Sequence, residues 1–165
     1  MQTFSSMRRN STNHQYIRHT LFVAILFLYQ IAGSVNTFLS PLIGVFFVYL
    51  LKNINKEYKK TKDNISIYLS FAYLIFFELN RGFYLFSTII LFFLILLFLK
   101  KRVISIFKSE NWIITIFVIS TYLGIYILNN IFCYLQEKEL YPFSFIYIFY
   151  ILIDSVVSIV LFKNR

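Results

Sequence analysis

Basic side chains occur in alternate polar segments of this chain, and this alternation constrains the fold more than any other feature. Of the 16 Lys and Arg residues, 14 lie in four segments, namely 8–18, 52–64, 100–111 and 163–165. The polar segments between them contain only Arg81 and Lys138 and lie around 35–37, 78–82 and 134–142. Cytoplasmic loops of membrane proteins retain Lys and Arg, whereas translocated loops are depleted of them. The pattern predicts an all-α membrane protein with six short transmembrane helices in one bundle and both termini in the cytoplasm.

The composition agrees with this prediction. Hydrophobic residues make up 59% of the chain and charged residues 14%, and the mean hydropathy is +0.70. The net charge of +9 resides in segments that flank apolar runs, so we expect it to contact anionic membrane lipid rather than nucleic acid. A single cysteine, Cys133, excludes an internal disulfide and any cysteine-rich metal site. At 165 residues, the chain forms one domain with little left for a module outside the membrane.

Two apolar runs are too long to cross a membrane once, because about 20 residues span the hydrocarbon. The run 17–51 is expected to divide near 34–37, with Pro41 in the opening turns of the second helix. The run 65–99 is expected to divide at a charged turn, 78–82. The first 16 residues, 1–16, are predicted to form a polar cytoplasmic segment. The six predicted spans follow it at about 17–34, 37–51, 65–79, 83–99, 112–132 and 143–162.

Asp154 falls near the middle of the last predicted span, where a carboxylate costs about 3 kcal/mol on insertion scales. At 100° per residue, Tyr147, Tyr150 and Ser158 lie on the same side of the helix and form a narrow polar stripe with it. An acid at this depth has three interpretations. It can join helices within the bundle through hydrogen bonds, contact the transmembrane helix of a partner, or bind a proton, cation or substrate.

The predicted outer turn carries Glu78, Asn80, Arg81 and Gly82. Glu78 and Arg81, three residues apart, either pair locally or face a periplasmic partner. Small residues four apart permit close approach of helices, and we expect them at helix–helix contacts. Three such pairs are present, namely Ser40 and Gly44, Ser66 and Ser70, and Ser120 and Gly124. Amides at Asn129 and Asn130 are expected to bond to neighbouring helices.

The chain carries no motif for catalysis, a cofactor or a metal. His14 and His19 lie in the polar N-terminal segment, so they form no zinc-binding helix with the His-Glu-x-x-His spacing. There is no Gly-x-Ser-x-Gly turn and no glycine-rich phosphate loop. We therefore expect a protein that is not an enzyme and that binds no cofactor, metal or nucleic acid.

The order of these features resembles the MreD family of the bacterial rod-shape (wall elongation) system. The resemblance rests on Leu39-Ser40-Pro41-Leu42-Ile43, on the acidic turn Glu78-Leu79-Asn80-Arg81-Gly82, and on Trp112 near the fifth span. It covers most of the chain as a pattern of six short spans with both termini inside. The chain departs from the family at Ser70 and Leu74, where glycines are usual, and at Glu78, where Asp is usual.

The resemblance implies a non-catalytic scaffold in the bacterial inner membrane. Such a scaffold would bind MreC and help to position the glycosyltransferase–transpeptidase pair that elongates the wall beneath MreB filaments. The family's fold is similar to that of the substrate-binding subunits of energy-coupling-factor vitamin transporters, so a subunit of that kind is one alternative. A membrane immunity protein against a pore-forming toxin, which would also be small, basic and aromatic, is another.

Overall fold

The computed structural model describes residues 24–36, 38–53 and 63–162, with the side chains of 63–66 excepted. All regular structure in these ranges is helical, so the all-α prediction is confirmed for the described part of the chain. The helices are Ala24–Val35, α2 (Ile43–Asn53), α3 (Asp63–Arg81), α4 (Ser87–Leu94), η1 (Ile95–Leu99), α5 (Lys100–Ile106), α6 (Glu110–Leu135) and α7 (Ile146–Phe162). Because α4, η1 and α5 follow one another without a break, they form one rod, and six rods result. Residues 1–23, with the predicted polar segment 1–16, His14 and His19, lie outside the described residues, as do 163–165 and the four lysines of 56–62.

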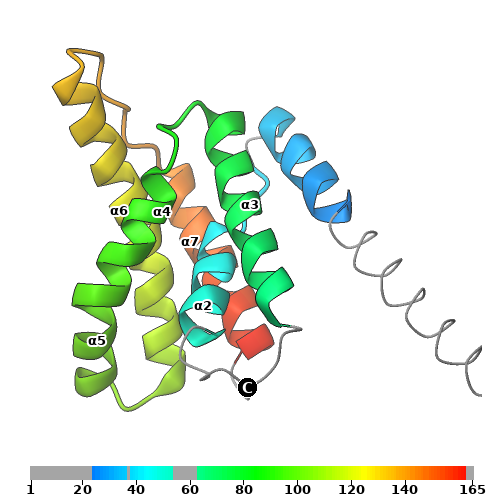
Figure 1. Cartoon of the computed structure of the whole chain (residues 1–165), viewed down its shortest axis with the longest axis vertical. Coiled ribbons are helices and arrows are strands. Elements are labelled where there is room, and N and C mark those ends of the chain that lie inside the picture. Colours follow the sequence, from blue (N-terminus) through cyan, green and yellow to red (C-terminus); the bar gives the residue numbers. More distant parts are fainter. Residues whose placement is uncertain (1–23, 37, 54–62, 163–165) are drawn as a thin grey trace, which may run out of the picture.

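The short helix α2 is the centre of the bundle. It packs against α6, α7 and α3, and α6 packs in turn against α7 and α4. Seven of the 11 residues of α2 are buried, among them Phe47, Leu50 and Leu51. Figure 1 shows α2 in the middle of the bundle, with the helix Ala24–Val35 at the margin beside α3. The core therefore surrounds one of the shortest helices.

Helix α2 begins about halfway along its neighbours. Its first turn contacts Asp154, the ninth of 17 residues in α7, and lies next to Tyr122, the thirteenth of 26 residues in α6. At 1.5 Å per residue, α2 is about 16 Å long and α6 about 39 Å. Residues 38–42, which precede α2, are not helical and continue the chain beyond the start of this short helix. The expectation that Pro41 lies inside the helix is therefore wrong, because the backbone turns at Leu42 (φ +54°) before α2 begins.

The fourth rod continues through basic residues that were expected to form a loop. The predicted span ended at 99, but α5 extends to Ile106 and includes Lys100, Lys101 and Arg102. The Lys100 ammonium group is buried and donates to the carbonyl oxygen of Leu51, in the last turn of α2. A cation at a helix C-terminus satisfies a free carbonyl, so this bond explains why the rod passes residue 99. Helices α3 and α6 likewise extend past 79 and 132.

The helix surfaces have an unusual distribution of polar groups. In α7 the buried side includes Asp154 and Ser158, whereas Phe149, Val156 and Val160 on the other side are 62–77% exposed. This arrangement is the reverse of that in a helix at the surface of a soluble protein. Helix α6 is long and apolar enough to cross a membrane, and Ala24–Val35, α2 and α7 are apolar but shorter.

Candidate functional site

Asp154 is the centre of a buried hydrogen-bond network that joins three helices. The side chain has no solvent exposure. Its Oδ2 atom accepts hydrogen bonds from the Tyr122 hydroxyl (2.8 Å) and from the backbone N–H of Gly44 (2.9 Å), and its Oδ1 atom accepts one from the Ser40 hydroxyl. All three groups are donors, and an ionised carboxylate is an acceptor only. Of the three interpretations, this geometry fits the one in which Asp154 joins helices within the bundle.

The local sequence explains why α2 begins at this carboxylate. The first turn of any helix has N–H groups without intrahelical partners and carries partial positive charge. Pro41 disfavours a helical conformation at Ser40, and Leu42 adopts a left-handed backbone, so the chain enters α2 abruptly. Asp154 then supplies the negative charge and the acceptor that this helix start requires.

A second layer of polar side chains surrounds the non-helical backbone before α2. The Tyr29 hydroxyl donates to the Ser40 carbonyl oxygen at 2.6 Å. The Tyr73 hydroxyl lies 2.8 Å from the Pro41 carbonyl oxygen and 2.9 Å from Gln30 Oε1, so it can donate to either acceptor. These bonds satisfy carbonyl groups that have no helical partner, as buried backbone requires.

Glu78 has an equivalent position at the start of α4. Its side chain is fully buried, and its oxygens accept from the N–H of Phe86 (2.7 Å), the hydroxyl of Ser87 (2.9 Å) and the N–H of Thr88. Phe86 has a left-handed backbone (φ +68°), as Leu42 has before α2. Each buried carboxylate therefore holds the N-terminus of a helix that begins abruptly.

The expected pairing of Glu78 with Arg81 is wrong, because Glu78 is occupied by α4. The Arg81 Nη2 atom instead donates to the Gly33 carbonyl oxygen at 2.8 Å, and the Asn80 amide donates to that of Gln30 at 2.9 Å. Both acceptors lie in the last turns of the helix Ala24–Val35, where free carbonyls attract donors and positive charge. Only Gly82 (φ +68°) leaves the helix, so the expected turn 78–82 is largely the end of α3.

A lysine occupies the C-terminal end of α7 in the same way. Lys52 Nζ donates to the Phe162 carbonyl oxygen at 2.6 Å and forms an ion pair with Glu110. Lys52, Lys100 of α5 and Arg81 therefore each donate to a carbonyl near a helix C-terminus, while the buried carboxylates Asp154 and Glu78 lie at helix N-termini.

The small residues divide between packing and hydrogen bonding. A Cβ atom on Gly44 would lie 2.7 Å from Val118 Cγ1, and one on Gly124 would collide with Leu91, so both glycines occupy close helix crossings. Ser40 precedes α2 instead of lying on it, and its hydroxyl binds Asp154.

The other small residues of the predicted pairs are serines. Ser70 is buried and Ser120 half-buried, and the Ser66 side chain lies outside the described part.

The polar stripe of α7 faces the interior of the bundle. Asp154, Tyr150 and Ser158 are buried, and Tyr147 is half-buried against the core. Asn129 and Asn130 bind loop backbone, since their Oδ1 atoms accept from the N–H groups of Tyr84 (2.9 Å) and Tyr141 (2.8 Å).

Three residues of this network, Tyr122, Tyr73 and Gln30, were not among the residues predicted from the sequence. Their signal was present, since each is a polar side chain well inside an apolar run, but the abundance of aromatic residues concealed it.

A cavity of about 180 Å³ lies between the Asp154 network and the end of the bundle where α3 ends and α7 begins. Its walls are mainly aromatic, and Arg81 is the one charged side chain among the lining residues. These are Pro41, Ile43, Phe77, Arg81, Phe83, Tyr122, Ile125, Ser144, Ile146, Tyr147 and Tyr150.

No group of three or more His, Cys, Asp or Glu side chains that could hold a metal occurs among residues 24–36, 38–53 and 63–162. In comparisons with known proteins, no family model, curated protein or solved structure matches this chain.

Proposed function

We propose that the chain is a multi-pass protein of the bacterial inner membrane, with six spans and both termini in the cytoplasm. Three features support this proposal: the length and hydropathy of α6, the apolar outer side and polar inner side of α7, and the alternation of basic segments. The paired helix ends support it as well, because backbone groups inside a bilayer find no water and need partners within the protein.

Within the membrane, we propose that the protein is a non-catalytic scaffold of cell-wall elongation, related in role to MreD. The observation that carries this proposal is that both buried carboxylates hold helix N-termini and that neither lines the cavity described above. Asp154 and Glu78 are fully occupied by donors at the starts of α2 and α4, so their negative charge stabilises the bundle. A rigid bundle of this kind presents fixed outer surfaces to partners, which is what a scaffold that binds MreC and a glycosyltransferase–transpeptidase pair requires.

The outer end of α3 is the surface on which we expect such a partner. In the predicted turn 78–82, Glu78 is buried against α4, and Asn80 and Arg81 bind the helix Ala24–Val35. The exposed residues of this turn are Leu79 (60% exposed) and Gly82. Recognition there depends on shape and apolar contact, because the exposed Leu79 and Gly82 carry no polar side chain.

Photocrosslinking in native cells tests this scaffold role. A photoreactive residue at Leu79, with one at Tyr68 on the same helix as the matched control, samples two exposed positions of α3. We expect MreC, and with it a wall transpeptidase, to be captured from Leu79 and not from Tyr68. Capture of a transporter ATPase and its coupling subunit, or of no wall protein from Leu79, would overturn the scaffold proposal.

The cavity beside Arg81 favours one alternative, a substrate-binding subunit of an energy-coupling-factor-type transporter. A subunit of that kind needs a pocket near the outer end of the bundle, and this cavity lies between α3 and α7 at the predicted outer end. The same photocrosslinking experiment separates this alternative from the scaffold, since each function has different partners.

A further inference from the structure

We propose that the cavity beside Arg81 binds a small organic anion that consists of one ring and a short acidic arm. The ring would lie between the aromatic walls, and the acidic group would pair with the Arg81 guanidinium. This inference goes beyond the scaffold function and does not depend on it, because it rests on the size, lining and charge of the cavity alone.

The size and walls of the cavity fit a single ring. An apolar cavity of about 150 Å³ accommodates benzene, so about 180 Å³ leaves room for a ring and a short arm. Phe77 and Phe83, with ring centroids 5.6 Å apart, contribute one part of the wall. Tyr150 contributes another, in an edge-to-face contact with Tyr147 at 6.2 Å. Aromatic rings pack favourably against such surfaces in offset or edge-to-face geometry.

The charge of the cavity selects an anion. Arg81 pairs with no carboxylate among the described residues, and its one hydrogen bond to them, from Nη2 to the Gly33 carbonyl oxygen, involves a neutral acceptor. A guanidinium group has five N–H donors in a planar fork, and it binds carboxylates through two parallel hydrogen bonds. Neither buried carboxylate forms an ion pair with Arg81, since Glu78 binds the start of α4 and Asp154 the start of α2.

A second donor lies at the same end of the cavity. Tyr147 lines the cavity together with Arg81, and its hydroxyl group can donate a hydrogen bond. The Tyr122 hydroxyl, in contrast, is bound to Asp154. An acidic group between Arg81 and Tyr147 would therefore meet donors, while the ring reaches inward toward Tyr122 and Ile125. A cationic ligand of the same shape would be repelled by Arg81.

The test uses the full chain in lipid nanodiscs and three probes that share one ring and one short arm. Phenylacetate carries the anion, phenylacetamide is its neutral counterpart, and phenethylamine carries a cation. Binding is measured by saturation-transfer NMR, with empty nanodiscs subtracted. We expect phenylacetate to bind with a Kd of about 1 mM or below, as its ten non-hydrogen atoms permit. Phenylacetamide and phenethylamine should bind at least tenfold more weakly.

Variants assign this binding to Arg81. Arg81→Gln should weaken phenylacetate binding at least tenfold, and Arg81→Lys should weaken it less. Asn80→Ala is the matched control, because Asn80 anchors the same helix end through Gln30 but does not line the cavity. Ile125→Phe, which fills the cavity without removing Arg81, should abolish binding. Equal binding of the three probes, unchanged binding to Arg81→Gln, or no binding of phenylacetate would overturn the proposal, as would a co-purified lipid that phenylacetate does not displace.

Discussion

At the residue scale, the two buried acids act through their position relative to helix ends. A lone carboxylate deep in an apolar bundle is unfavourable unless donors surround it. Asp154 has the hydroxyls of Ser40 and Tyr122 and the N–H of Gly44. Its charge also faces the positive end of the α2 dipole. From sequence alone, an acidic residue in the middle of an apolar helix also fits a binding site. In this structure Asp154 accepts a hydrogen bond from the first turn of α2.

Asp154→Asn tests this role. The amide keeps one acceptor oxygen and loses the negative charge that faces the start of α2, so the charge-assisted bonds from Ser40, Tyr122 and the Gly44 N–H are weakened, and one hydroxyl must turn to accept from the new NH2 group. We expect the free energy of unfolding to fall by about 2–4 kcal/mol. The measurement is unfolding by SDS in mixed micelles, followed by circular dichroism.

Ser155→Ala is the control for this substitution. Ser155 is the next residue of α7, is buried, and its hydroxyl has no partner among the described residues, so its loss should change stability by less than about 0.5 kcal/mol. If Asp154→Asn proves as stable as Ser155→Ala, the carboxylate does not hold α2 in place.

At the element scale, the close crossing of α2 and α6 depends on a glycine. A Cβ atom at Gly44 would lie 2.7 Å from Val118 Cγ1 and 3.1 Å from Asp154 Oδ2. Both neighbours are held by the packed interior and by the network described above, so little room exists for adjustment. The first turn of α2 therefore approaches α6 and α7 only because it carries no side chain at this position.

Gly44→Ala should therefore destabilise the bundle by about 1–3 kcal/mol, the usual cost of overpacking a well-packed core. Gly33→Ala provides the comparison, because a Cβ atom there meets only Leu39 at 3.8 Å, an ordinary contact. Replacing a helical glycine by alanine, where the added Cβ atom makes only an ordinary contact, is neutral or stabilising. Parallel SDS titrations of the two variants measure the difference, and equal stabilities would contradict the close crossing.

The helices themselves could be predicted from sequence more reliably than their ends. Apolar runs and charge alternation gave six rods, because both signals are local. The start of α2 depends on Asp154, 110 residues away from Gly44, and no local pattern contains that contact. Glu78 looked like a turn residue because it is charged and precedes a glycine, but its position is set by α4. Lys100 looked like a loop residue because it begins a basic segment after an apolar run, and it instead binds the end of α2.

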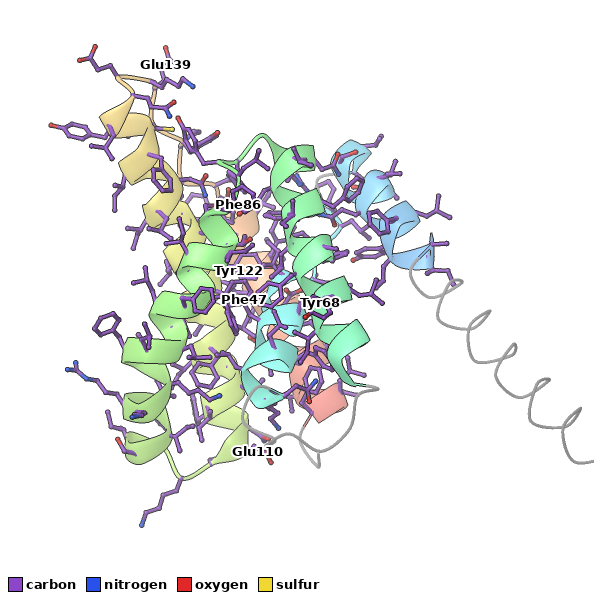
Figure 2. All side chains as sticks on the ribbon, in the orientation of Figure 1. Phe47, Tyr68, Phe86, Glu110, Tyr122 and Glu139 are labelled. Carbon is purple, nitrogen blue, oxygen red and sulfur yellow. The ribbon has the colours of Figure 1, made fainter. Side chains whose placement is uncertain are left out.

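At the scale of the whole molecule, the charges divide between two ends of the bundle. Glu110 and Glu139 lie at opposite ends in Figure 2, on either side of the long helix α6. The connection between α5 and α6, at the Glu110 end, carries Lys108, and α5 itself begins with Lys100, Lys101 and Arg102, whereas the connection that carries Glu139 has Lys138 as its one basic residue. If the chain spans the membrane as proposed, the positive-inside rule predicts the Glu110 end in the cytoplasm and the Glu139 end outside.

Cysteine labelling in intact cells tests this orientation directly. The native Cys133 is first replaced by serine, and single cysteines are then placed at exposed positions, Asn36 and Glu139 at one end and Lys101 and Lys108 at the other. A membrane-impermeant maleimide should label Asn36→Cys and Glu139→Cys in intact cells. It should label Lys101→Cys and Lys108→Cys only after the membrane is permeabilised. Because α6 connects the two ends, labelling of Lys108→Cys and Glu139→Cys from the same side would show that α6 does not cross the membrane, and the six-span proposal would fail with it.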